Sequence, residues 1–308
     1  MRLRYYSMKA LTLEKLFYQL ITRATAVLSL VACSFITSAQ ENLFSLLDDD
    51  EGGPEPVTAT FKGSRVILGH SVKTKAKGEL EFLITHRFGR LNSGAHNLWG
   101  LDNSSVRLGL EYGISDRFNI GIGRSSFDKS FDGFLKYKAV QQMTEGAPVS
   151  VVAFTSMAIK TTPRESEDPT IEFKDRVAYT YQVIIGRKFN SNFSFQLAPT
   201  IVNRNLVNGL TQENTVFALG MGLRQKLTQS LALNLEYYYR FNEHDNSPSL
   251  NSVSIGFDIE TGGHVFQLHL TNSIMTIERS FITETEDDFW DGDIHFGFNI
   301  SRTFQLDK

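Results

Sequence analysis

A short polar turn followed by strict alternation of apolar and polar residues recurs along this chain of 308 residues. Such turns lie at 114–118, 189–193 and 227–231. After the last of them, apolar or aromatic side chains occupy every second position from Leu231 to Tyr239. A period of two over many segments predicts β-strands with two chemically different faces. The apolar face must meet either a protein core or lipid, and that choice decides the class of the protein.

The pattern predicts twelve strands, at 78–90, 104–113, 117–126, 130–141, 147–160, 175–188, 192–204, 213–226, 230–242, 250–260, 263–273 and 292–304. Tight turns around Ser115, Gly146, Ser191, Gln229 and Gly262 alternate with mostly longer polar links, of which 127–129 is the short exception. Bacterial outer-membrane barrels combine an even strand count with short periplasmic turns and long external loops. By this parity residues 60–68 lie in the periplasm or the lumen, unless a fourteenth strand exists.

Strand length and side-chain distribution favour a membrane over a soluble core. Strands near ten residues or longer match a tilted membrane span, whereas globular strands usually have five or six residues. Aromatic residues gather near strand ends, as in the girdles of membrane barrels: Phe88, Tyr112, Phe118, Phe193, Tyr239, Phe241 and Phe304. We therefore predict an all-β fold, an antiparallel up-and-down transmembrane β-barrel of about 12 strands (12–14). A secreted β-sandwich or jelly roll is the alternative.

The N-terminal residues differ in kind from the rest. Five basic residues and then an apolar run ending at Ala39 indicate a cleaved secretory signal peptide at 1–39. Cys33 offers lipidation as an alternative, and translation starting at Met8 would shorten the basic region. Residues 40–59 read as an acidic, flexible periplasmic tail before a barrel at 60–308. Cleavage would change the net charge from −3 to −7, which argues against a nucleic-acid partner.

Three stretches carry a family resemblance: FKGSRVILGHSVKTKAKGELEFLITHRFGRLNSG at 61–94, VRLGLEYGISDRFNIGIGRSSFDKSFDGFLKYK at 106–138 and WDGDIHFGFNISRTF at 290–304. They resemble an uncharacterised family of membrane-bound β-barrels from Bacteroidota, a domain of unknown function. The resemblance implies a barrel in the bacterial outer membrane, and the even strand count predicts that both termini are periplasmic. It implies no activity and no catalytic residues.

Charged side chains share the phase that faces away from the apolar positions, and we expect them to line the lumen. They are Glu81, Arg87, Arg107, Glu111, Lys136, Lys138, Glu236, Arg240, Asp258, His269 and His295. Mixed charges across a lumen can form a constriction that sorts solutes. They can equally form an ion-pair network that fills the barrel. Since twelve strands enclose a lumen only between those of packed eight-stranded barrels and open porins, filling is favoured.

The remaining motifs have plainer interpretations. His269 and His295 lack the spacing of a zinc motif, so we expect neither a metal nor a cofactor. His86 lies in the apolar phase, near the external rim. The Gly121-Ile-Gly123 and Gly220-Met-Gly222 pairs indicate small positions facing the lumen, not nucleotide loops. The acidic stretch 284–291 reads as a solvated external loop, with binding of divalent cations as the alternative.

Three functions remain open at this point. The first is a narrow channel or solute-specific transport component. The second is a non-conducting structural or docking barrel that anchors a periplasmic or surface partner through 41–56 and 60–77. The third is a lipid-modifying outer-membrane enzyme, although no catalytic residues stand out and we do not expect an enzyme. The implied partners are outer-membrane lipid and lipopolysaccharide, the barrel-assembly machinery and, for docking, a periplasmic protein.

Overall fold

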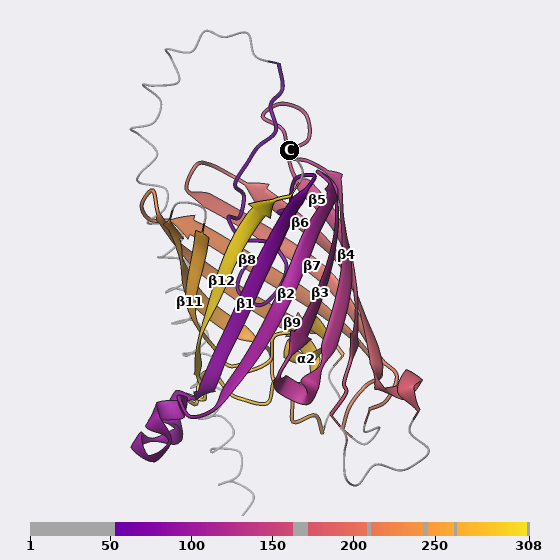
Figure 1. Cartoon of the computed structure of the whole chain (residues 1–308), viewed down its shortest axis with the longest axis vertical. Helices are drawn as coiled ribbons and strands as arrows, with labels where there is room; N and C mark the ends of the chain where they lie inside the picture. Colours follow the sequence, from indigo (N-terminus) through magenta and orange to yellow (C-terminus); the bar gives the residue numbers. More distant parts are fainter. Residues whose placement is uncertain (1–52, 163–171, 208–210, 243–245, 262–263, 307–308) are drawn as a thin grey trace, which may run out of the picture. The chain divides into compact units, whose positions relative to one another are not determined.

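The computed structural model describes residues 53–162, 172–207, 211–242, 246–261 and 264–306. The chain divides into two units, Met1–Gly53 and Pro54–Lys308, and the second is a closed antiparallel β-barrel (Figure 1). The predictions for residues 1–52, which are the signal peptide, the lipidation site and the acidic run at 48–51, lie outside the described residues. All the described strands belong to the second unit.

Twelve strands form the barrel, and each pairs with its neighbours in the chain. Their bounds are β1 Glu79–Arg90, β2 Ser104–Ser115, β3 Phe118–Ser125, β4 Phe131–Val140, β5 Ser150–Ile159, β6 Val177–Lys188, β7 Phe193–Arg204, β8 Thr215–Lys226, β9 Leu231–Arg240, β10 Val253–Thr261, β11 His264–Thr271 and β12 His295–Gln305. The barrel closes where β1 pairs with β12, with Phe82 opposite Arg302. All twelve predicted strands are confirmed, each end to within three residues. Closure at twelve leaves no place for a fourteenth strand, so that alternative was wrong.

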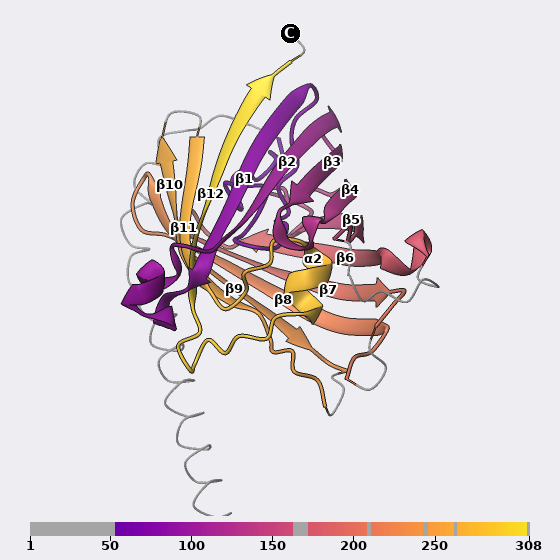
Figure 2. The same cartoon turned by 60° about the horizontal axis from the view of Figure 1, so that its bottom comes forward.

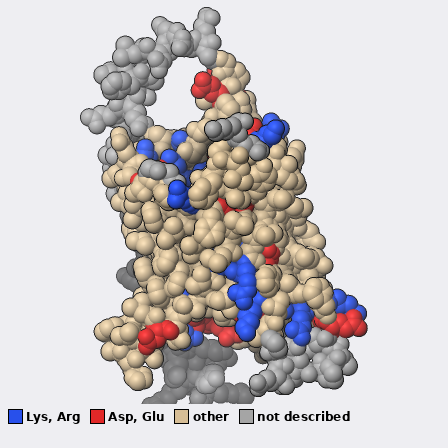
Figure 3. Space-filling model, in the orientation of Figure 1, with Lys and Arg blue, Asp and Glu red and all other residues tan. Residues whose placement is uncertain are grey.

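Side chains alternate between the two faces of the wall as the period of two predicts. On β2, Leu108 and Leu110 are exposed on the outside, while Arg107 and Glu111 are buried inside. The same outward exposure of large apolar side chains recurs on the other strands, and Figure 3 shows a wall that is mostly neither basic nor acidic. An apolar surface that surrounds the barrel needs lipid around it, because soluble proteins rarely expose such an area. Within the described ranges, no helix is long and apolar enough to cross a membrane.

The connections differ between the two ends of the barrel, as predicted. One end, which we call the loop end, carries the longer links and the 3₁₀ helices η2 (Leu91–Ser93), η3 (Ala95–Gly100), η4 (Phe127–Lys129) and η5 (Phe173–Arg176). The other, the turn end, carries the short turns; in Figure 1 it is the upper end. The link between β4 and β5 is longer than the tight turn we expected. Its Met143 forms a β-bridge with Pro56 and so holds the chain that enters the barrel.

Residues 60–77, which precede β1, fold back into the lumen, and we call this segment the plug. Arg65 and His70 form a β-bridge, and Ser71 donates a backbone hydrogen bond to Ser64 at 2.9 Å, so the middle of the plug is a small hairpin. Val66 and Ile67 are almost fully buried. Of the alternatives that strand parity left for residues 60–68, the lumen is therefore the right one.

A second insertion enters from the loop end. The link between β11 and β12 contains the short helix α2 (Glu278–Thr283), all six residues of which are buried. Figure 2 shows α2 at the loop end, encircled by the strands. Phe281 packs edge-on against Tyr238 of β9, with ring centroids 5.1 Å apart.

This insertion corrects part of the prediction of a solvated acidic loop at 284–291, in which Glu286, Trp290 and Asp291 are exposed as expected. Thr285 and Asp287 are buried, because the apolar side chains of Ile277, Phe281 and Ile282 draw the link into the barrel. Sequence reasoning judged the loop by its charges alone and missed this apolar anchor.

The apolar core lies inside the barrel, between wall and insertions. It joins plug residues such as Val66 and Val72 to α2 and to inward side chains of β4–β9. The inner faces of β5–β8 contribute Val152, Phe154, Ile184, Ala198, Val202, Val216 and Ala218. The inner face is thus more apolar on this side than the polar lumen we predicted, because it packs against the plug and not against water.

Candidate functional site

The eleven predicted lumen residues all lie on the inner face of the wall. Ten of them are buried, and Lys138, near the turn end, is half-buried. The charges lie mainly on β1, β2, β4 and β9–β12, while the apolar inner face lies on β5–β8. The question for function is whether these charges face an open passage or protein.

Two wall carboxylates hold the plug. Glu81 accepts hydrogen bonds from Ser64 Oγ at 2.5 Å and from Lys75 Nζ at 2.6 Å. Glu236 accepts from the backbone N–H groups of Leu68 at 2.6 Å and Gly69 at 3.0 Å. A buried carboxylate that accepts two donors is well satisfied, so these contacts fix the plug against β1 and β9.

Most of the other inward charges find partners in the wall or the insertions, whereas neither ring nitrogen of His269 has a hydrogen-bond partner among the described residues. Arg107 donates to both carboxylate oxygens of Asp132 at 2.8 and 2.5 Å, in the two-bond geometry that guanidinium groups favour. The further pairs are Asn119 with Glu111, Arg87 with Asn299, Gln267 with Asp258, Arg240 with the carbonyl oxygen of Ser249, and Lys136 with the carbonyl oxygen of Lys73. Most of the predicted residues therefore take part in an interior hydrogen-bond network between the wall and the insertions.

The two insertions meet inside the barrel. Arg65 of the plug donates to the carboxylate of Glu278 in α2, and both side chains are almost fully buried. His70 Nε2 lies 3.6 Å from the same carboxylate, and its ring lies 4.6 Å from the ring of Phe134 and 4.4 Å from that of Phe154. Segments that enter from the two ends of the barrel thus meet inside the lumen.

The two inward histidines of β11 and β12 have different surroundings. His295 bonds to Asp287 Oδ2 at 2.5 Å and to the carbonyl oxygen of Phe88 at 2.8 Å, whereas His269 faces Gly297. In the part of the chain that the structure describes, no three His, Cys, Asp or Glu side chains gather as a metal would require.

Asp287 sits at the loop end as an anchor of the inserted link. Burial raises the pKa of its carboxyl group, but hydrogen bonds from His295 and Arg90 lower the pKa more, so the net shift is below the ordinary value of 3.8. The carboxylate therefore stays charged and ties the link to β1 and β12.

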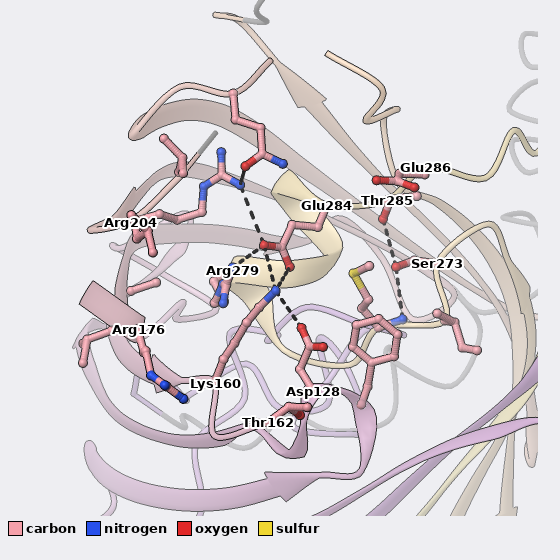
Figure 4. Close-up of a pocket in the computed structure, with 18 of the residues that line it drawn as sticks. Asp128, Lys160, Thr162, Arg176, Arg204, Ser273, Arg279, Glu284, Thr285 and Glu286 are labelled. Carbon is pink, nitrogen blue, oxygen red and sulfur yellow. Dashed lines mark hydrogen bonds and ion pairs between the residues drawn. The ribbon is translucent and has the colours of Figure 1, made fainter. Parts of the chain in front are cut away.

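A polar pocket of about 760 Å³ opens at the loop end, beside the inserted link (Figure 4). Glu284 lies at its centre: Lys160 Nζ approaches it at 3.1 Å, Arg204 Nη1 at 3.8 Å, and Arg279 donates to it directly. Lys160 also pairs with Asp128 Oδ2 at 2.6 Å. The volume is within the range of small-molecule sites, although its charges largely compensate one another.

Sequence reasoning missed the basic residues of this pocket and the plug charges Arg65 and Lys75. Lys160 and Arg204 occupy the inward phase at the loop-end limits of predicted strands, so the period of two could have found them. Arg65, Lys75 and Glu278 lie outside any strand, and no periodic signal marks them.

The paired glycines are small inward positions, as predicted. A Cβ on Gly123 would lie 2.2 Å from the Arg107 guanidinium, and one on Gly222 would lie 3.1 Å from Val66 of the plug. The second contact is the close approach of an interior chain that such glycines indicated.

His86 faces outward, as its phase predicted. Its ring stacks on Phe298 with centroids 4.9 Å apart and lies 4.3 Å from Phe88.

Comparisons with known proteins give one family match and several similar solved structures. The sequence pattern of the family described as membrane bound beta barrel domain (DUF5777) matches residues 61–304. None of the curated proteins compared with the chain matches it. Similar solved structures include the KdgM porin (6% identity, 74% of this chain and 99% of that chain, TM-score 0.43) and an outer membrane channel from Pseudomonas putida F1 (12%, 76% and 98%, 0.45). Outer membrane phospholipase A from Escherichia coli is another (11%, 72% and 92%, 0.39).

Proposed function

Since the chain belongs to the family of membrane bound beta barrel domains, we propose that it is an outer-membrane barrel that stays closed and serves as a structural or docking component. The observation that carries this proposal is the filled lumen, in which the plug and α2 meet through Arg65 and Glu278. An open diffusion channel would require the plug and α2 to leave the lumen.

The size of the buried apolar contact makes spontaneous opening rare. Phe61, Val66, Ile67, Leu68 and Val72 of the plug are each at most 2% exposed. Burial of such a side chain contributes about 1.5–3 kcal/mol, so the five together hold the plug by roughly 8–15 kcal/mol before chain entropy is subtracted. A ligand that displaced the plug would need a comparable preference for the open state.

Backbone hydrogen bonds at the turn end explain how the barrel would anchor the residues that precede Pro54. At the turn end, Val57 donates to the carbonyl oxygen of Gln142 at 2.8 Å and Thr144 donates to that of Glu55 at 2.8 Å. Outer-membrane barrels have their short turns on the periplasmic side, so our proposal assigns the turn end to the periplasm. A periplasmic partner bound to residues before Pro54 would therefore be held at the membrane through the plug.

Planar-bilayer recordings of the purified full chain test the proposal. We expect no stepwise current above background. A variant lacking residues 54–77, verified as folded by heat-dependent migration in gels, serves as the control that shows current when the plug is absent. Uniform current steps from the full chain would overturn the proposal.

Gated transport is the second candidate, and two observations favour it. The loop-end pocket includes Arg279 and Glu284, which lie in and directly after α2, so a bound solute would touch an insertion. Among the described residues, the plug binds the wall through side chains and not through a strand ladder, so it can leave without opening the sheet.

A disulfide lock distinguishes the two candidates. A Cβ built on Gly186 of β6 lies 3.4 Å from Val72 Cβ, close to the separation found in disulfides. If the plug must move for transport, oxidation of the Val72→Cys/Gly186→Cys variant should abolish solute uptake. Reduction of the disulfide should then restore the uptake. Unchanged uptake in cells with the lock formed would rule out gating by the plug, and the two single-cysteine variants control for the substitutions.

A further inference from the structure

The outer wall carries an apolar groove of about 510 Å³ across β1–β5, on the side that faces lipid. One row of paired positions runs across it: Phe82 opposite Leu110, Leu110 opposite Ile122, Ile122 opposite Gly133 and Gly133 opposite Met157. Four members of the row are large apolar residues and one has no side chain. Gly133 thus leaves a hollow in an otherwise filled surface.

The backbone does not require glycine at this position. A Cβ on Gly133 would meet only the carbonyl oxygen of Gly121, at 3.8 Å, which is ordinary van der Waals contact. This contrasts with the inward glycines, where a Cβ would collide with Arg107, Phe134 or Tyr238. The hollow at Gly133 is therefore open space on the lipid side and not a consequence of packing inside the barrel.

A cation stands at one end of the groove. Arg124 lies in the next row toward the loop end, between Leu108 and Phe131, and its guanidinium lies 5.5 Å from the centre of the Phe131 ring. The side chain is exposed on the outer face, and β3 ends one residue later. Figure 3 shows basic atoms gathered near the lower, loop end of this face. A lipid-facing arginine is tolerated near the membrane interface, so Arg124 marks the level of the headgroups.

We propose that this groove binds a phosphorylated, multiply acylated glycolipid of the outer leaflet. Acyl chains fill the hollow at Gly133 and lie along Ile122 and Met157, and a phosphate pairs with Arg124. The planar guanidinium matches phosphate with two hydrogen bonds. The breadth of the groove, which spans five strands, suits several chains better than one.

The choice of leaflet rests on the proposed outer-membrane location, but the binding does not rest on the closed lumen. The test of lipid binding is therefore independent of the bilayer recordings. A barrel that conducts current can still bind the lipid, and a barrel that conducts none can fail to bind it.

The experiment measures lipid retained by the purified full chain, counted by native mass spectrometry after exposure to lipid A, phosphatidylglycerol or phosphatidylcholine. We expect retention of lipid A, with Arg124→Gln and Gly133→Leu each weakening it about tenfold, which corresponds to about 1.4 kcal/mol. Arg187→Gln, which removes an outward arginine at the turn end, and Ala153→Leu, which enlarges an exposed residue outside the groove, are the matched controls.

Three results would overturn the proposal. Retention by Arg124→Gln and Gly133→Leu equal to that of the unaltered chain would show that neither the cation nor the hollow matters. Preference for phosphatidylglycerol would assign the groove to a different lipid. Equal losses in the two control variants would show a non-specific lipid layer. Melting temperatures near that of the unaltered protein establish that each variant is folded.

Discussion

Arg65 and Glu278 form a buried ion pair between two segments separated by more than two hundred residues, one entering the barrel from each end. Arg65 also donates to the carbonyl oxygen of Leu68 at 2.8 Å, so it fixes the plug hairpin as well as the contact with α2. This pair makes the two insertions one interior body. Removal of either partner should therefore loosen both.

The first prediction concerns this pair. Glu278→Gln leaves the guanidinium of Arg65 buried without a counter-charge, and we expect the free energy of unfolding to fall by about 3 kcal/mol. Arg65→Met combined with Glu278→Met should recover most of that loss, because two apolar side chains replace two charges. Urea titration of the purified barrel in detergent measures both. A double variant no better than Glu278→Gln would show that the charges themselves are needed.

The second prediction concerns the tip of the plug hairpin. A Cβ on Gly69 would lie 1.9 Å from the hydroxyl oxygen of Tyr238 and 2.8 Å from Glu236 Oε1. Gly69→Ala should therefore push the plug away from β9 and lower the free energy of unfolding by about 1–3 kcal/mol. Gly133→Ala, which enters open space, is the matched control and should be nearly neutral. Equal melting temperatures for the two variants would contradict the tight contact at Gly69.

The wall of the barrel was predictable because its signal is local and repeated. Alternation such as that at Leu108 and Leu110 places each strand and each face, and the alternation of short and long links gives the strand parity. The inward charges were assigned from the same phase. The inward phase does not indicate whether Arg107 contacts water or Asp132, because an inward position is compatible with either contact.

The insertions were not predictable in the same way. The plug has no period of two, and its charges Arg65 and Lys75 are read as solvated until their partners are known. The link around α2 was interpreted as an acidic loop because the charges of Glu284 and Asp287 indicate solvent exposure more strongly than Phe281 indicates burial. Its burial depends on contacts with distant strands, such as that of Phe281 with Tyr238, which no local pattern reveals.

The third prediction concerns pH. The pKa of Asp287 is lowered in the folded protein, so its contribution to stability is complete above the ordinary value of 3.8 and is lost as pH falls through the folded pKa. Asp287→Asn removes that contribution at all pH values. The difference in melting temperature between the unaltered protein and the variant should therefore be largest near neutral pH and shrink in acid. A difference that stays constant down to about pH 2 would exclude this role for the carboxylate.

The fourth prediction concerns substitution of Arg107. An open lumen and a filled lumen predict opposite effects of this substitution. Its guanidinium holds Asp132 through two bonds and packs closely against Gly109 and Gly123. In a filled barrel, Arg107→Ala leaves the Asp132 carboxylate buried alone, and the free energy of unfolding should fall by about 3–5 kcal/mol. Arg107→Ala with Asp132→Ala should lose less, because no unpaired charge remains. Neither variant should pass current in a planar bilayer as long as the plug stays in place. Unchanged stability together with altered ion selectivity would instead place Arg107 in a conducting passage.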